Sequence, residues 1–206
     1  LIVDVGLAGI NLIGVIIAIF VGISFFNKEI ERRTIYTIMA RPISRASFIM
    51  GKYLGLALTL FVNMAIMWAV FLLTLWLYHV SIQPSIFQAV ALIFVEILVV
   101  TAIALFFSTF TSTTLSAIFT LGLYVIGHLT ADLRAMVANS DSGPIKSLVD
   151  LLYYLCPNLE MLNIKGQAAV GVVAAPEYVM LASLYGVMYA GVLLISACVV
   201  FQQRDF

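Results

Sequence analysis

Five long apolar runs dominate this sequence, and they leave few folds open to it. A helix of about 20 apolar residues is long enough to cross the roughly 30 Å hydrocarbon layer of a bilayer. Hydrophobic residues make up 64% of the chain and charged residues only 10%, whereas charged residues make up about a quarter of a soluble domain. We therefore predict an all-α polytopic membrane protein with one transmembrane domain over residues 1–206. Its expected spans cover residues 3–26, 50–78, 86–109, 113–130 and 178–201.

Positively charged residues are spread unevenly over the connections between these runs. Six of the ten Lys and Arg residues lie in the polar stretch after the first run: Lys28, Arg32, Arg33, Arg41, Arg45 and Lys52. Arg204 in the C-terminal tail adds a seventh on the same side. The opposite side carries three: Arg134, Lys146 and Lys165. Because cytoplasmic connections are enriched in Lys and Arg, we expect residues 27–49 and the C-terminus in the cytoplasm and residues 131–177 outside it.

The polar stretch has the pattern of a short amphipathic helix. One stripe of that helix would be formed by Ile30, Thr34, Ile35, Ile38 and Met39. Glu29 and Glu31 come near its expected start, where the positive end of the helix dipole stabilises acidic side chains. Pro42 is expected to end the helix. These residues alone leave two interpretations open. The helix either rests on anionic membrane lipid or inserts its stripe into a groove of a soluble partner.

One carboxylate, Glu96, lies well inside an apolar run. A charge near the centre of a bilayer costs about 2.5–3.5 kcal/mol on insertion scales, so such a residue is a candidate functional residue. Asn63 in the preceding run is expected at a similar depth and is a candidate partner. Two roles remain open for Glu96: a hydrogen-bonded structural glutamate, or a residue that lines a substrate pathway or gate.

Signals for other chemistry are absent from the sequence. Gly51-Lys52 is followed by Tyr53 rather than Ser or Thr, so it does not complete a phosphate-binding loop. No serine-nucleophile elbow or zinc-protease motif is present, and a net charge of zero offers nucleic acid no basic surface. The histidines and cysteines are interpreted as packing or hydrogen-bonding residues: His79, His128, Cys156 and Cys198. We expect no catalytic residue, no metal and no cofactor on this chain.

The longest connection, residues 131–177, contains a second amphipathic pattern. Its apolar residues recur at helical spacing: Ile145, Leu148, Val149, Leu152 and Tyr153. Such a helix is suited to lying on the membrane surface rather than to crossing it. Pro157 is expected to end it.

The polar stretch also carries a motif with a specific spacing. It reads Glu29-x-Glu31-x-x-Thr34-Ile35-x-x-Ile38-Met39-x-x-Pro42-Ile43-Ser44-Arg45, followed by Gly51-Lys52. This pattern resembles the signature of type-2 ABC exporter permeases, which is roughly E-R-E-x-G-T-L-x-x-L-L-x-x-P-V-S-R with G-K opening the next helix. The chain has Ile30 in place of the usual Arg and Arg33 in place of the usual Gly. Weaker resemblances lie in three later segments: Phe107–Ser112, Pro157–Glu160 and Phe201–Asp205.

The resemblance implies the transmembrane subunit of an ATP-driven exporter in the bacterial inner (plasma) membrane. Such permeases have six helices per protomer, so one helix would precede this sequence, and they work as homodimers or paired half-transporters. Each protomer contacts a separate ATPase subunit, which binds ATP and Mg²⁺, through its cytoplasmic coupling helix. The coupling residues implied here are Glu29, Glu31, Thr34, Ile35, Ile38, Met39, Pro42, Ser44, Arg45 and Lys52. They would transmit force without bond chemistry, while short helices in residues 131–177 would cap the pathway.

A function from a different class remains as the alternative. A stand-alone ion-coupled transporter or channel would use Glu96 as its titrating group. It predicts transport without an ATPase and a strong dependence on Glu96, whereas the permease interpretation predicts an ATPase that binds at residues 27–49.

Overall fold

The computed structural model describes the chain except for residues 32–44, 139–148, 152–155 and 204–206. The described residues form helices and connections, with no strand among them. The long helices are α1 (Ile2–Glu31), α3 (Arg45–Leu77), α4 (Pro84–Ser108), α5 (Thr113–Ala138) and α8 (Pro176–Gln202). Two short helices, η1 (Leu159–Leu162) and α7 (Lys165–Ala169), lie between α5 and α8. Five helices are long and apolar enough to cross a membrane, which confirms the predicted all-α polytopic fold.

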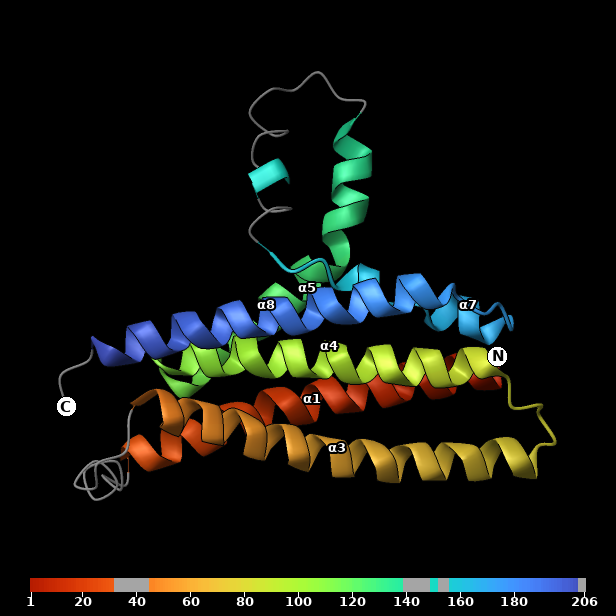
Figure 1. Cartoon of the computed structure of the whole chain (residues 1–206), viewed down its shortest axis with the longest axis horizontal. Helices are drawn as coiled ribbons and strands as arrows, with labels where there is room; N and C mark the ends of the chain where they lie inside the picture. The colour runs from red at the N-terminus through yellow and green to blue at the C-terminus, as the bar shows by residue number, and fades with distance from the viewer. Residues whose placement is uncertain (32–44, 139–148, 152–155, 204–206) are drawn as a thin grey trace.

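Helix α4 forms the centre of the bundle. It contacts each of the other long helices as well as η1 and α7, and α1, α3, α4 and α8 run side by side along the long axis (Figure 1). In its most apolar stretch, 61% of the α4 residues are buried, against 22% of those in the corresponding stretch of α3. The outward faces of α1, α3 and α8 carry large exposed apolar side chains, as expected of helices surrounded by hydrocarbon. The buried core therefore lies around α4.

Small residues let neighbouring helices approach α4 closely. A Cβ atom at Gly14 of α1 would collide with Ile97 of α4, and one at Gly186 of α8 would collide with Val95 of α4. Lipid tails are as apolar as the side chains of a neighbouring helix, so the hydrophobic effect does not drive helices together inside a membrane. Close packing of this kind is therefore a main contribution to their association. These glycines therefore bring α1 and α8 onto α4.

Hydroxyl groups make the turn between α4 and α5. The side chains of Ser108, Thr109 and Thr111 each donate to a backbone carbonyl three or four residues earlier, at 2.8, 2.7 and 2.8 Å. The Thr111 hydroxyl also lies 2.6 Å from the Ser116 hydroxyl at the start of α5. The same three carbonyls also accept backbone N–H groups of the turn, so the hydroxyls find second acceptor positions on Leu105, Phe106 and Phe107 and are not left unpaired at the end of the apolar helix.

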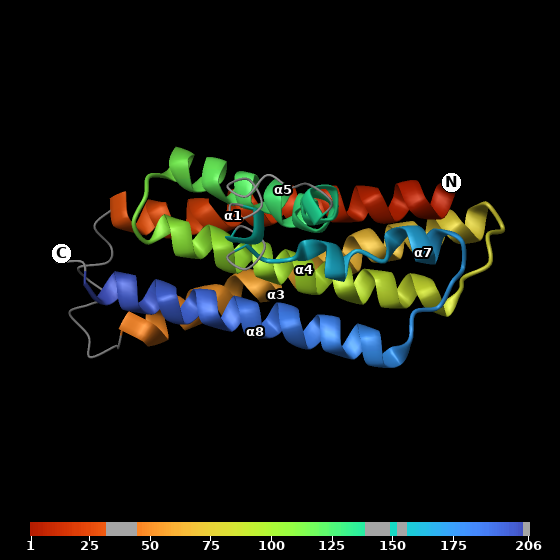
Figure 2. The same ribbon diagram turned by 90° about the horizontal axis from the view of Figure 1, so that it is seen from above.

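Helix α5 leaves the bundle before it ends. Its first part packs against α1 and α4, and its last part projects away from the other helices (Figure 1). Figure 2 shows this projecting end toward the viewer, with α7 lying along α4. The chain returns at Pro157, whose carbonyl oxygen would lie 2.7 Å from a Cβ atom at Gly127 of α5. Gly127 therefore permits the contact that holds the returning segment against α5.

The segment after η1 is tied to α4 by a side-chain amide. Gln88 Nε2 donates to the carbonyl of Ala174 at 3.1 Å, and Gln88 Oε1 accepts from the Ala174 N–H at 3.0 Å. The amide replaces the backbone partners that this irregular segment lacks. It positions the connection that leads into α8.

The structure differs from the sequence expectation just after the first span. Within α1, Ile2–Ser24 is the stretch apolar enough to cross a membrane. We expected a separate helix to begin near Glu29, but α1 continues as one helix as far as Glu31, because no Pro or Gly breaks the helical pattern between Phe26 and Glu31. Glu29 and Glu31 therefore belong to the same helix as the first span. The remainder of the expected coupling helix lies outside the described residues.

The second amphipathic pattern is described only in part. Residues 149–151 are helical, and Asp150 forms an ion pair with Arg134 of α5 at 3.6 Å, with both side chains about two fifths exposed, at 40% and 44%. The other residues of that pattern lie outside the described part of the chain. An exposed pair of this kind contributes at most about 1 kcal/mol.

Candidate functional site

A buried carboxylate stands at the centre of the bundle. Glu96 is the thirteenth of the 25 residues of α4, and its side chain is 0% exposed. Apolar residues precede and follow it along the helix, so its partners must come from other helices. A buried carboxylate without such partners is strongly unfavourable.

The first partner comes from α1. Asn11 Nδ2 lies 3.3 Å from both Oε1 and Oε2 of Glu96, and Asn11 itself is 3% exposed. The amide donates to both carboxylate oxygens, and it joins residues 85 positions apart in sequence. Asn11 is also the polar residue that interrupts the apolar run of α1. Its Oδ1 atom is buried and has no hydrogen-bond partner among the described residues.

The second partner comes from α5. His128 Nε2 lies 3.3 Å from Glu96 Oε1, which is an ion-pair distance, although Nε2 lies outside hydrogen-bond geometry. The other ring nitrogen, Nδ1, lies 3.1 Å from the backbone oxygen of Tyr124. Tyr124 and His128 are four residues apart and share one face of α5, with ring centroids 4.7 Å apart. The hydroxyl of Tyr124 interacts with Glu96 and with Asn11.

Three side chains thus surround the carboxylate of Glu96, and we call the four residues the polar cluster: Asn11, Glu96, Tyr124 and His128. They link α1, α4 and α5 inside the membrane-spanning bundle. An amide, a phenol and an imidazole are all able to donate hydrogen bonds. The arrangement can stabilise a carboxylate, and it can hold a proton.

Asn63 does not join the polar cluster. Its Nδ2 atom donates to the carbonyl of Thr59 on its own helix at 2.9 Å. Glu96 has Asn11 and His128 as its partners instead, so the expected pairing of Asn63 with Glu96 is replaced by contacts from α1 and α5. Similar depth places two residues at one level of a bilayer, but the rotation of each helix decides which way they point.

Most of the predicted coupling residues lie outside the part of the chain that the structure describes. Glu29 and Glu31 belong to α1, and their side chains lie outside the description. Arg45 begins α3, and residues 34–44 lie outside the described residues. Lys52 is the exception, because its Nζ atom lies 5.5 Å from the centroid of the Phe48 ring. Phe48 stacks on Phe201 of α8 with a centroid distance of 6.0 Å.

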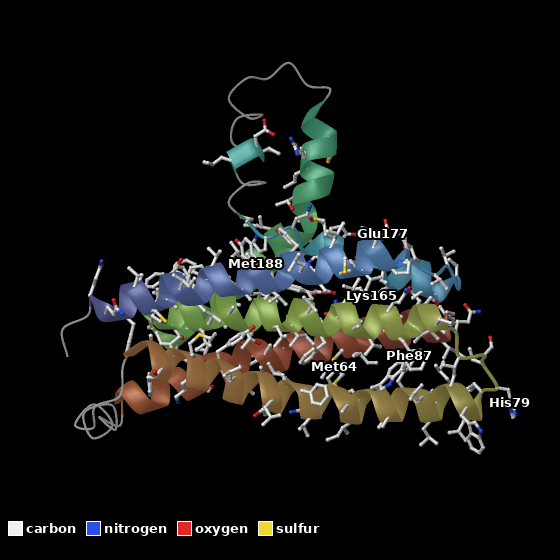
Figure 3. The ribbon with its side chains drawn as sticks, viewed as in Figure 1. Met64, His79, Phe87, Lys165, Glu177 and Met188 are labelled. Atoms are coloured by element: carbon white, nitrogen blue, oxygen red, sulfur yellow. The ribbon has the colours of Figure 1, made fainter. Side chains whose placement is uncertain are left out.

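These contacts mark one end of the bundle. The end of α1, the start of α3, the turn between α4 and α5 and the C-terminal end of α8 all lie at the left in Figure 1. His79, in the connection between α3 and α4, is at the opposite end (Figure 3). The described helix ends that flank the connections assigned by the sequence to one side of the membrane are therefore found at one end of the bundle.

The other His and Cys side chains considered in the sequence do not form a metal or nucleophile site among the described residues. Among the described residues, no group of three or more His, Cys, Asp or Glu side chains could hold a metal ion. Burial raises the pKa of the Cys156 thiol, which keeps it protonated and a poor nucleophile. His79 lies in an exposed turn with a positive φ of 53°.

An apolar groove lies on the other face of α4. It has a volume of about 510 Å³ and is lined mainly by α3 and α4, with aromatic rings from Phe61, Trp68, Phe87 and Phe94. Met64 and Phe87 lie between these two helices in Figure 3. The groove lies within the membrane-spanning region, and Glu96 is not among its lining residues.

Sequence reasoning singled out Glu96 but missed three of its neighbours. Asn11 was one polar residue in an apolar run, and His128 was interpreted as an interfacial packing residue. One signal was available: Tyr124 and His128 are spaced four residues apart in the least apolar of the five spans. Polar residues on one face of a span indicate a polar neighbour in the bundle interior.

Comparison with known proteins identifies a family. A family model described as "ABC-2 family transporter protein" matches residues 5–206. Neither the search of curated proteins nor the search of solved structures gave a match. The family match covers every span, the polar stretch and the connection between α5 and α8.

Proposed function

The chain belongs to the ABC-2 family of transporter proteins, and we propose that it couples ATP hydrolysis on a separate subunit to export of a substrate. In this proposal the chain is a permease subunit, and the partner ATPase binds ATP and Mg²⁺. A second permease protomer completes the transporter in the bacterial inner membrane. The family match over all five spans carries the proposal, and the motif in residues 29–45 supports its coupling role.

The coupling segment, residues 27–49, is the proposed ATPase contact. Its predicted apolar stripe enters a groove of the ATPase, and the basic residues around it remain in the cytoplasm. Movement of the ATPase on ATP binding then displaces this segment as a rigid body. The segment carries force and no bond chemistry.

The continuity of α1 supports a path from that segment into the membrane. Asn11 and Glu31 belong to one helix, and the 20 steps between them span about 30 Å at 1.5 Å per residue. A displacement at the cytoplasmic end of a continuous helix reaches its other turns without an intervening hinge. In the proposal Asn11 passes it to Glu96, so the polar cluster lines the pathway or its gate.

The test is co-purification of the chain with a soluble ATPase. Ile35→Asp and Ile38→Asp place a charge in the predicted docking stripe and are expected to release the ATPase. Tyr36→Asp is the matched control, because a helix with 100° between residues places Tyr36 on the opposite face. The proposal fails if the wild-type chain has no ATPase partner, or if Ile35→Asp and Ile38→Asp leave the complex intact.

A further inference from the structure

We propose that Glu96 and His128 share one proton and form a proton-binding site inside the membrane-spanning bundle. This inference deepens the proposed role of the polar cluster, and only its activity measurement rests on the proposed function. It follows from three observations: the contact of each imidazole nitrogen, the burial of the carboxylate and the donors around it.

The first step fixes the tautomer of His128. Its Nδ1 atom lies 3.1 Å from the backbone oxygen of Tyr124. A carbonyl oxygen only accepts hydrogen bonds, so Nδ1 must carry a hydrogen. In a neutral imidazole the other nitrogen, Nε2, is then a bare acceptor.

The second step places the proton. Nε2 lies 3.3 Å from Glu96 Oε1, at an ion-pair distance but outside hydrogen-bond alignment. A bare Nε2 at that distance would place its partial negative charge beside an ionised carboxylate, which is a repulsion. One proton removes this repulsion, either on Nε2 as an imidazolium beside a carboxylate, or on Glu96 as a carboxylic acid beside a neutral imidazole. Both arrangements contain the same atoms and have a net charge of zero.

The third step concerns burial. Glu96 is 0% exposed, and the His128 side chain is 20% exposed. Loss of the shared proton leaves a net negative charge inside the bundle, which is unfavourable without a new partner. The Asn11 amide already donates to both carboxylate oxygens and stabilises whichever of them is charged. His128 is the more exposed member of the pair, so it is where a proton enters and leaves.

Other titratable groups near the pair are few among the described residues. Tyr124 interacts with Glu96, and Lys165 of α7 acts electrostatically on His128. Four further titratable side chains on the elements packed around the pair have contacts of their own elsewhere. The Tyr53 hydroxyl of α3 donates to Leu98 O, the Tyr185 hydroxyl of α8 accepts from Asn158 N, Tyr189 packs on Tyr185, and Glu160 accepts from Asn163.

The shared proton has a mechanical consequence. It joins α4 to α5, while Asn11 joins the same carboxylate to α1. Loss of the proton replaces an attraction between α4 and α5 by a repulsion, so the packing of α5 becomes dependent on pH. The site therefore links proton binding to the position of the helix whose end projects from the bundle.

Nuclear magnetic resonance of the histidine nitrogens tests the proposal, because the chain has few histidines to distinguish. The chain has two, His79 and His128, so the His79→Gln variant leaves His128 as the single source of imidazole signals. We would label histidine with ¹⁵N in this full-length variant, in phospholipid nanodiscs, and record its nitrogen resonances. The expected spectrum has Nδ1 protonated and Nε2 in contact with a proton. Glu96→Gln is expected to shift the Nε2 resonance strongly and leave Nδ1 protonated.

Opposite outcomes overturn the inference. His128 resonances that do not change on Glu96→Gln, or an Nδ1 atom without hydrogen, exclude a shared proton. Should Glu96→Gln fail to fold, Glu96→Asp keeps the carboxylate but draws it back by one methylene. The shared proton then requires a shift at Nε2 with Nδ1 still protonated, and an unchanged Nε2 signal in that variant contradicts it.

A second measurement connects the site to transport. The pH profile of ATPase activity of the complex is expected to flatten in the double variant Glu96→Gln/His128→Gln and to stay unchanged in His79→Gln. A profile that is the same in all three proteins contradicts a role of the proton in transport. The resonance experiment needs no ATPase, so absence of a partner ATPase would overturn the proposed function and leave the proton site standing.

Discussion

At the scale of single residues, the unusual feature is a buried carboxylate, Glu96, with three polar side chains around it that lower the free-energy cost of its burial. Glu96 is as buried as the leucines and isoleucines around it. The amide of Asn11 donates to both carboxylate oxygens, and the imidazole of His128 and the phenol of Tyr124 act on the carboxylate electrostatically, in place of the water that it would otherwise need. The same contacts that lower the cost of burial also join three helices. A structural role and a transport role therefore involve the same atoms.

Removal of one donor should measure that stabilisation. Asn11→Ala takes away the amide that faces both carboxylate oxygens, and hydrogen bonds to charged groups contribute about 1.5–3 kcal/mol. We expect a loss of stability of that size, seen as a lower thermal unfolding temperature in nanodiscs.

Asn63→Ala is the matched control for that change. Asn63 bonds only to the backbone of its own helix, so the substitution should alter stability by no more than about 0.5 kcal/mol. Equal losses in the two variants would show that Asn11 does not stabilise Glu96.

At the scale of elements, α5 determines how the segment between α5 and α8 meets the bundle. Its first part packs on α1 and α4, and its end projects from them (Figure 1). Between these parts, Gly127 lies against the Pro157 carbonyl, next to His128. The returning segment is fixed there as well, because the N–H of Asn158 donates to the Tyr185 hydroxyl at 2.8 Å. Contact at Gly127 therefore positions both the segment that begins at Pro157 and the imidazole of His128.

A side chain at Gly127 should disturb this contact. In Gly127→Ala the new Cβ would lie 2.7 Å from a backbone oxygen and 3.0 Å from Leu159, and backbone does not yield as a flexible side chain does. Overpacking of this kind costs about 1–3 kcal/mol. We expect a lower unfolding temperature and altered His128 resonances.

Gly122→Ala tests the same helix without the contact. No atom lies within 4 Å of a Cβ at Gly122, and alanine favours helix by up to about 1 kcal/mol over glycine. This variant should be neutral or slightly more stable. If Gly127→Ala were equally harmless, the proposed role of the Pro157 contact would be wrong.

At the scale of the whole molecule, the ends of the helices sort the connections into two groups. The end of α1, the start of α3, the hydroxyl-rich turn and the end of α8 share one end of the bundle, and the connection between α3 and α4 lies at the other (Figures 1 and 3). The sequence assigns seven Lys and Arg to the side of the first group and three, all in residues 131–177, to the opposite side. This difference predicts an orientation with the first group in the cytoplasm, through the preference of Lys and Arg for that side.

Cysteine labelling should reveal that orientation. Ser81→Cys and Gln203→Cys place a thiol on exposed residues at opposite ends of the bundle, in a background in which Cys156 and Cys198 are replaced by serine. A membrane-impermeant maleimide added to intact spheroplasts should label Ser81→Cys and not Gln203→Cys. Permeabilised cells, in which both should react, provide the control, and the reverse pattern in spheroplasts would invert the topology.

Several features of the molecule follow from sequence alone. The five apolar runs require five spanning helices, because only an apolar helix about 20 residues long satisfies both its backbone and the bilayer. The motif in residues 29–45 indicated the ABC permease family, and the family match confirms it. Glu96 stood out because a carboxylate is rare at that depth. Each of these inferences rests on local pattern and length.

Tertiary structure decided what surrounds Glu96. Depth along a helix can be counted from the sequence, and it suggested Asn63, but the rotation of each helix about its axis depends on packing. Gly14 and Ile97 bring α1 onto α4, and this contact presents Asn11, 85 residues away in sequence, to the carboxylate. The turn and bend of α5 bring His128 to the same point. The close packing of whole helices determines which residues so distant in sequence meet. Local sequence patterns do not predict that packing, because each helix can rotate about its axis without a change in its own pattern.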